Sequence, residues 1–169
     1  FVACGTSYHA SLVAKDWIEQ YTKITCTAEV ASEYKYKKIN VLPNTLFISI
    51  SQSGETADTI SCVKKATKLK YQNTLAICNV AESTLTRLSD LVFLMNAGPE
   101  ISVASTKAFT SQLFTLLLLT IILSRKFGKF ESSMVKDIKA IDETIDRLYK
   151  MEPDIKSIST KFKNTKVFI

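Results

Sequence analysis

Short apolar runs alternate with longer amphipathic segments along most of the chain. The short runs have the length of buried strands, and the longer segments have the 3.6-residue periodicity of helices. The pattern predicts five strands, over residues 1–4, 24–30, 45–50, 74–79 and 91–95. It predicts intervening helices over residues 8–21, 32–38, 57–69, 83–88 and 106–126, with Ser83 as an N-cap.

Strands that alternate with helices indicate a parallel sheet, because each crossover helix must bury its apolar stripe against the sheet. The predicted fold class is a three-layer α/β/α sandwich with a five-stranded parallel sheet, of the flavodoxin-like kind. After residue 130 the pattern changes to an amphipathic helix over residues 131–151 and a shorter helix after Pro153. We therefore expect a domain over residues 1–130 and a helical bridge over residues 131–166.

Both ends of the sequence lie inside apolar runs, 1–3 and 167–169, and residue 1 is not Met. We therefore expect the chain to be part of a longer protein, with residues 167–169 beginning a further domain. The longest uncharged stretch, 108–124, contains several Ser, Thr and Gln residues. This composition indicates a helix buried inside the fold, and we expect no membrane contact.

The composition indicates a folded soluble protein, since 46% of the 169 residues are hydrophobic and 22% are charged. Residues 1–124 carry 11 basic and 9 acidic side chains, and residues 125–169 carry 11 and 7. In the basic C-terminal third the two signs are interleaved, which is typical of a solvated helix face, so we expect no nucleic-acid partner. The four cysteines have no C-x-x-C spacing and His9 is the single histidine, so we expect a reduced, cytoplasmic protein without a metal site.

Two loops rich in small hydroxyl residues follow predicted strands and lead into helices. They are 4–7 (CGTS) and 51–56 (SQSGET). In an open parallel sheet the ligand crevice lies beyond the carboxyl ends of the strands, and helix N-termini there favour an anion. Hydroxyl groups, an amide and the backbone near Gly54 suit a phosphate monoester. Neither loop has the glycine and lysine spacing of nucleotide-binding loops.

Simpler roles exist for the same residues. Thr6 and Ser7 have the composition of an ordinary turn and N-cap, and Glu55 is either a general base or, as we favour, a partner of the following helix dipole. His9 is expected to be structural or to face solvent. A third polar loop, over residues 96–107, is either a capping segment with Ser105 or Thr106 as N-cap, or a source of contacts from Val103 and Ser105 to a sugar.

Three segments occur in order along the chain: 3–8 (ACGTSY), 51–58 (SQSGETAD) and 103–110 (VASTKAFT). Together they resemble the sugar isomerase (SIS) domain of the glutamine–fructose-6-phosphate aminotransferase (isomerising) family, the glucosamine-6-phosphate synthases. The resemblance covers nearly the whole chain and is closest to the first of two SIS subdomains in the isomerase half of the family.

The resemblance implies a site for fructose 6-phosphate. Its phosphate is expected on Ser7, Ser51, Gln52, Ser53 and Thr56, and its sugar near Thr6, Val103 and Ser105. The family's acid–base Glu, Schiff-base Lys and ring-opening His belong to segments that this sequence does not contain. The chain alone is therefore expected to bind the sugar phosphate without catalysis, and with no cofactor and no metal.

The resemblance also implies partners. They are a glutaminase domain and a second SIS subdomain of the parent chain, a second copy in a homodimer, and the product glucosamine 6-phosphate. The alternative is a non-catalytic SIS sensor of sugar phosphates that regulates a partner domain.

Overall fold

A computed structural model describes residues 1–101 and 106–166 of the chain. The chain divides into two compact units, Phe1–Phe130 and Glu131–Ile169. The first contains a sheet with helices on both faces, and the described part of the second, residues 131–166, contains helices and no strand. The two units are described in turn.

The first unit contains a five-stranded parallel sheet in the order β2-β1-β3-β4-β5. The strands are β1 (Val2–Ala3), β2 (Glu29–Val30), β3 (Leu46–Ser51), β4 (Asn73–Cys78) and β5 (Leu91–Leu94). All five lie within predicted strands or one residue beyond them. The predicted α/β sandwich with a five-stranded parallel sheet is therefore confirmed.

The strand predicted over residues 24–30 is shorter than expected. Only Glu29 and Val30 pair with β1. Upstream, side chains take the place of a neighbouring strand: the Ile24 N–H donates to Thr22 Oγ1 (3.0 Å) and the Cys26 N–H donates to Glu19 Oε1 (2.9 Å). Because these backbone groups are already satisfied, the alternating pattern before residue 29 does not form a ladder.

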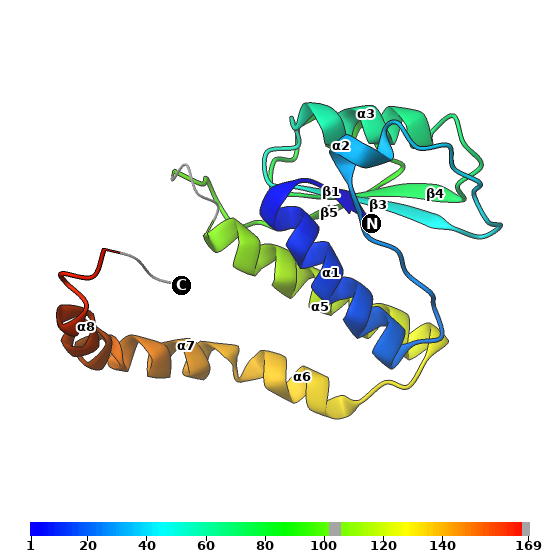
Figure 1. Cartoon of the computed structure of the whole chain (residues 1–169). Coiled ribbons are helices and arrows are strands. Elements are labelled where there is room, and N and C mark those ends of the chain that lie inside the picture. Colours follow the sequence, from blue (N-terminus) through cyan, green and yellow to red (C-terminus); the bar gives the residue numbers. More distant parts are fainter. Residues whose placement is uncertain (102–105, 167–169) are drawn as a thin grey trace. The chain divides into compact units, whose positions relative to one another are not determined.

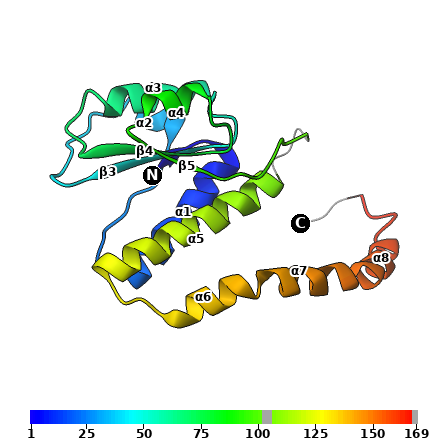
Figure 2. The same cartoon turned by 180° about the vertical axis from the view of Figure 1, so that it is seen from behind.

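Helices cover both faces of the sheet (Figures 1 and 2). On one face lie α2 (Ala31–Tyr34), α3 (Ala57–Ala66) and α4 (Thr84–Leu88), and on the other lie α1 (Gly5–Tyr21) and α5 (Lys107–Phe127). Ser83 is the N-cap of α4, as predicted, and its hydroxyl accepts from the Thr86 N–H (3.3 Å). The three layers place the loops at the carboxyl ends of β1 and β3 next to each other.

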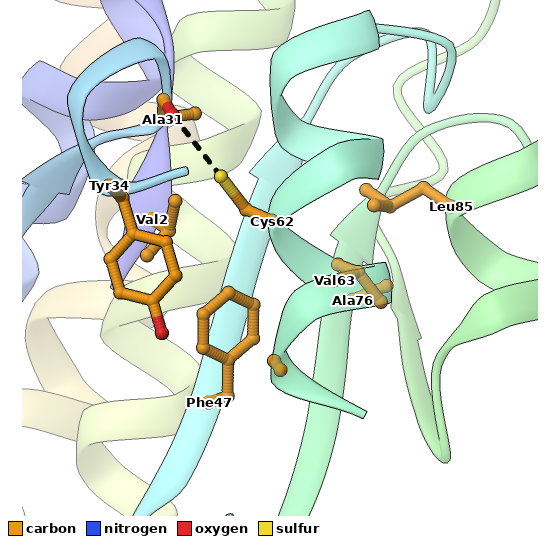
Figure 3. Close-up of a cluster of buried hydrophobic side chains, with 9 residues drawn as sticks. Val2, Ala31, Tyr34, Phe47, Cys62, Val63, Ala76 and Leu85 are labelled. Atoms are coloured by element: carbon orange, nitrogen blue, oxygen red, sulfur yellow. Dashed lines mark hydrogen bonds between the residues drawn. The ribbon is translucent and has the colours of Figure 1, made fainter. Parts of the chain in front are cut away.

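The core beneath α2, α3 and α4 combines aromatic and small side chains (Figure 3). The Phe47 ring lies 5.5 Å from the Tyr34 ring and 5.3 Å from the Tyr71 ring, centroid to centroid. The two tyrosine hydroxyls are hydrogen bonded to each other at 2.7 Å. Cys62 Sγ donates to the Ala31 carbonyl (3.2 Å), and burial raises the pKa of this thiol to about 11. Ring contacts and hydrogen bonds therefore hold α2 and α3 against this face of the sheet.

On the opposite face, small residues let α1 approach α5. Ala10 and Ala14 of α1 are fully buried, as are Leu116 and Thr120 of α5. By length and composition α5 could cross a membrane, with 21 residues and a mean hydropathy of 1.6. Its buried side chains pack in the same cluster as α1 and the strands, whereas Phe114 and Ile122 are exposed. The prediction of a helix buried inside the fold is therefore confirmed for one face of α5 only.

The second unit contains α6 (Ser132–Lys139), α7 (Ile141–Lys150) and α8 (Glu152–Lys161). The single helix predicted over residues 131–151 is wrong, because the chain breaks at Ala140 (φ −88°, ψ 0°). The Ala140 N–H is shared between the carbonyls of Lys136 and Asp137, at 3.1 Å each, which tightens the last turn of α6. Neither α7 nor α8 has a buried residue among those described.

Candidate functional site

A cavity of about 280 Å³ lies at the carboxyl ends of β1 and β3. The strand order reverses between these two strands, which is where open α/β sheets bind ligands. Six of the eight predicted site residues line it: Thr6, Ser7, Ser51, Gln52, Ser53 and Thr56. The other two, Val103 and Ser105, lie outside the described residues. The other described residues that line it are Cys4, Gly5 and Ile50.

The first wall of the cavity is the start of α1. The sequence predicts this helix from Tyr8, but it begins at Gly5, so Thr6 and Ser7 belong to its first turn. Periodicity could not detect this turn, because Gly5, Thr6 and Ser7 supply no apolar position. Cys4 caps the helix without a side-chain hydrogen bond, so the first N–H groups lack a capping side chain.

Ser7 lines the cavity and is buried, with only 8% of the residue exposed. Its hydroxyl makes no hydrogen bond with any residue in 1–101 or 106–166, whereas its backbone carbonyl accepts from Ser11 Oγ (2.9 Å). A hydroxyl that lines a cavity and makes no hydrogen bond within the protein has its donor available for a bound anion.

The second wall is the loop between β3 and α3. Ser51 Oγ accepts from the Gly54 N–H (3.0 Å) and lies 3.2 Å from Thr56 Oγ1. Ser53 Oγ accepts from the Glu55 N–H (3.2 Å). Thr56 caps α3 without a side-chain hydrogen bond, so the first turn of α3 also lacks a capping side chain. The two walls together offer hydroxyl groups, one amide and two helix N-termini.

Gly54 brings the second wall against the segment that leads into α4. Its φ of +68° lies in the left-handed region, and a Cβ atom there would lie 2.1 Å from Ser83 Oγ and 2.8 Å from Cys78 Sγ. The Gly54 carbonyl accepts from the Leu85 N–H (3.0 Å), and the Gln52 carbonyl accepts from the Asn79 N–H (3.2 Å). Gly54 does not line the cavity, so the close approach of the backbone that the sequence predicts at Gly54 is made to the segment before α4 and not to a ligand.

Glu55 has a different role from either one expected. Its carboxylate is not part of the cavity lining and accepts from the Thr84 N–H, at the start of α4, at 2.6 Å. Hydrogen bonds from the Thr84 N–H and side chain hold the pKa of Glu55 below its ordinary value. Both expectations for Glu55 are wrong, because the carboxylate is an ionised acceptor for α4 rather than a base or a partner of α3. His9, by contrast, is exposed on α1, as expected.

Two residues to which the sequence analysis gave no role organise the start of the third loop. Asn79 donates from Nδ2 to the Gly98 carbonyl (2.7 Å) and accepts at Oδ1 from the Ala97 N–H (2.8 Å). Glu100 Oε2 accepts from the Ala108 N–H (3.1 Å) and so caps α5, while Thr106 at the N-cap makes no such bond. The signal for Asn79 is its place directly after a buried strand at the same edge as the cavity.

The described lining of the cavity is polar and uncharged. None of the nine lining residues that the structure describes is Lys, Arg, Asp or Glu. Within the described ranges, no group of three or more His, Cys, Asp or Glu side chains is arranged to hold a metal ion. Anion binding here would depend on hydroxyl donors and on the backbone N–H groups of α1 and α3.

Comparison with known proteins gives the same picture of the fold. The SIS domain family model matches residues 1–122. The glutamine–fructose-6-phosphate aminotransferase (isomerizing) of Pseudomonas putida is 48% identical over 165 residues, which is 95% of this chain and 27% of that protein. The chain therefore spans about a quarter of the length of the relatives it matches.

Two solved structures are similar over most of the chain. The C-terminal domain of glucosamine-fructose-6-phosphate aminotransferase from Francisella tularensis superposes with a TM-score of 0.90 at 44% identity, over 96% of this chain and 47% of that one. Glucosamine-6-phosphate deaminase from Thermotoga maritima superposes with a TM-score of 0.72 at 25% identity, over 89% of this chain and 46% of that one.

Proposed function

Because the chain belongs to the SIS domain family, we propose that its cavity binds the phosphate group of fructose 6-phosphate. The observation that carries the proposal is the cavity itself, which gathers six hydroxyl- or amide-bearing residues at the switch point of the sheet. We choose fructose 6-phosphate because it appears in the names of the similar aminotransferases from Pseudomonas putida and Francisella tularensis.

Each wall contributes a part of the phosphate site. Ser7 donates its hydroxyl from the first turn of α1, and Ser51, Ser53 and Thr56 donate from the second wall. Gln52 adds its amide. The N-termini of α1 and α3 favour the dianion through their uncapped N–H groups, so the site needs no lysine or arginine. We place the sugar near Thr6, Val103 and Ser105.

We propose that the chain is the substrate-binding part of the isomerase domain of a glutamine–fructose-6-phosphate aminotransferase, which makes glucosamine 6-phosphate. Proton transfer and imine chemistry require groups that are absent from the described residues of the cavity lining, so we assign them to other segments of the longer protein. The proposed partners are a glutaminase domain and a second SIS subdomain, and the proposed location is the cytoplasm. The exposed Phe114 and Ile122 of α5 support a homodimer.

A regulatory sensor is not favoured, because the similar proteins named here are aminotransferases and a deaminase.

Calorimetric titration of the full-length protein with fructose 6-phosphate tests the proposal. We expect saturable binding, and we expect Ser53→Ala and Thr56→Ala each to raise the Kd severalfold, since each removes a donor to a desolvated phosphate. Ser61→Ala, on an exposed position of α3, is the matched control and should leave the Kd unchanged.

The proposal fails if fructose 6-phosphate does not bind, or if a flavin or nucleotide binds in its place. It also fails if both hydroxyl variants bind as tightly as the wild type.

A further inference from the structure

We infer that Glu55 is a positioning residue of the cavity, which holds the second wall in its binding geometry through the Thr84 N–H without touching the ligand. The inference rests on the proposed function, since it assumes that the cavity binds a phosphate. It assigns to Glu55 the task of aligning Ser53 and Thr56, its neighbours in the wall.

The place of Glu55 in the chain is the first argument. It lies two residues after Ser53 and directly before Thr56, and both of these residues line the cavity, whereas Glu55 does not. Its backbone N–H donates to Ser53 Oγ (3.2 Å), while its carboxylate reaches the first residue of α4 (2.6 Å). One residue therefore orients a cavity hydroxyl with its main chain and anchors the wall with its side chain.

The nature of the anchor is the second argument. Among the contacts described between this wall and the segment from Cys78 to Leu85, the bond at Glu55 has the only charged acceptor. The others involve backbone carbonyls, at Gly54 and Gln52. A hydrogen bond to a carboxylate is shorter and stronger than a neutral one. Lowering of the Glu55 pKa by the Thr84 donors agrees with an acceptor that stays ionised.

The third argument is the support of α4, the helix to which the Glu55 carboxylate bonds. Hydrogen bonds and burial hold the start of this helix in place. Ser83 and Thr86 close the first turn of α4 through a hydroxyl pair 3.2 Å apart, and Thr86 Oγ1 also donates to the Ala81 carbonyl (2.7 Å). Leu85 and Ser83 are buried. The anchor therefore joins a loop that must present hydroxyls to a helix that is fixed in the core.

The test is ligand affinity measured with inorganic phosphate and with fructose 6-phosphate on the full-length protein. In Glu55→Ala we expect the Kd for both probes to rise about five- to tenfold, with Tm nearly unchanged because the side chain is exposed. Glu55→Gln keeps an acceptor oxygen for the Thr84 N–H but loses the charge, so its Kd should lie between that of the wild type and that of Glu55→Ala. Glu82→Ala removes an exposed carboxylate nearby and should change neither quantity.

A second variant tests whether Glu55 acts on the Kd through the Thr84 N–H. Thr84 is the first residue of α4, where proline is well tolerated, and Ser83 before it is already extended (φ −76°, ψ 162°). Thr84→Pro removes the N–H donor and should raise the Kd as Glu55→Ala does. The double variant should bind as weakly as either single variant and no more weakly.

Three outcomes overturn the inference. These are an unchanged Kd in Glu55→Ala, a Glu55→Gln variant as weak as Glu55→Ala, and additive effects of Glu55→Ala and Thr84→Pro. If the wild type binds the probes and these outcomes appear, the proposed function survives and the positioning role does not. If the wild type binds neither probe, the proposed function fails, and hydrogen exchange at the Gly54 and Leu85 amides still shows whether Glu55→Ala loosens the wall.

Discussion

The two walls of the cavity look alike in sequence and differ in support. Each follows a central strand, contains a glycine with positive φ and presents hydroxyl groups at a helix N-terminus. The Cβ position of Gly5 meets no atom within 4 Å, whereas that of Gly54 lies 2.1 Å from Ser83 Oγ. The first wall is thus supported by its own helix, and the second is also packed against α4. Equivalent motifs should therefore differ in their tolerance of substitution.

The largest expected effect is that of Gly54→Ala. A non-glycine residue in the left-handed region costs about 1–2 kcal/mol, and a methyl group forced into a packed site costs about 1–3 kcal/mol. Because Ser83 Cβ also lies within 2.4 Å of the added atom, a change of the Ser83 rotamer cannot relieve the clash. We expect the free energy of unfolding to fall by about 2–4 kcal/mol, measured by urea denaturation.

Gly5→Ala is the matched control for that measurement. Its φ of +55° carries the backbone cost, but no neighbouring atom opposes the methyl group. We expect a loss of about 1 kcal/mol. Equal losses at the two glycines would show that the packing against α4 does not distinguish the walls.

A smaller difference in stability is expected between alanine variants of two buried serines, one from each wall. Ser51 Oγ is engaged by Gly54 and Thr56, whereas Ser7 Oγ has no partner in the described part of the chain. Ser51→Ala leaves the Gly54 N–H without its acceptor, so we expect it to lower the free energy of unfolding by about 1 kcal/mol and to weaken phosphate binding. Ser7→Ala should weaken binding with almost no change in stability.

Thermal melts and phosphate titrations on both serine variants give the comparison. A Ser7→Ala variant that loses stability but binds normally would contradict it. So would a Ser51→Ala variant with wild-type stability.

The smallest expected effect is a dependence on pH that only the second wall shows. Hydrogen bonds from Thr84 hold the pKa of Glu55 below 4.5. A carboxylate whose pKa is depressed by hydrogen bonds stabilises the local structure that those bonds hold at pH values above its ordinary pKa, and this local contribution is lost as the pH falls through the folded-state pKa. We therefore expect protection of the Gly54 amide against hydrogen exchange to be constant from about pH 5 to 8 and to fall below about pH 4.5.

The Tyr8 amide in the first wall should not show this loss. Protonation of Asp90, whose pKa is lowered by the donors of Thr74, weakens the contact of Asp90 with β4 over a similar acidic range. Glu55→Gln is therefore the control, because it leaves the Asp90 contribution and removes that of Glu55. If the acid-induced loss at Gly54 persists in Glu55→Gln, the prediction is wrong.

Much of the fold follows from local patterns. The apolar strands at 46–51 and 73–78 are long and bounded by polar residues, and they appear within one residue of the prediction. The Ser83 cap also follows, because a serine before a helical segment satisfies a local N–H. Local signals suffice where a residue's partner lies within a few positions along the chain.

The errors occur where the partner is distant. Glu55 bonds to a residue 29 positions away, and no sequence spacing indicates that pairing. The absence of a ladder before Glu29 depends on a side chain of α1, Glu19. Six residues of the candidate site were brought together as expected, because the carboxyl ends of parallel strands share one edge. Their role as phosphate ligands stays a prediction.

The strand order has a consequence for how the molecule assembles. β1 lies between β2 and β3, so the two walls come from segments more than forty residues apart that meet only when β3 docks. Closing that interval costs loop entropy before any contact across the cavity is gained. The pocket then exists only in chains in which β1 and β3 have paired. A ligand bound there would raise the unfolding temperature of the whole first unit rather than that of one loop.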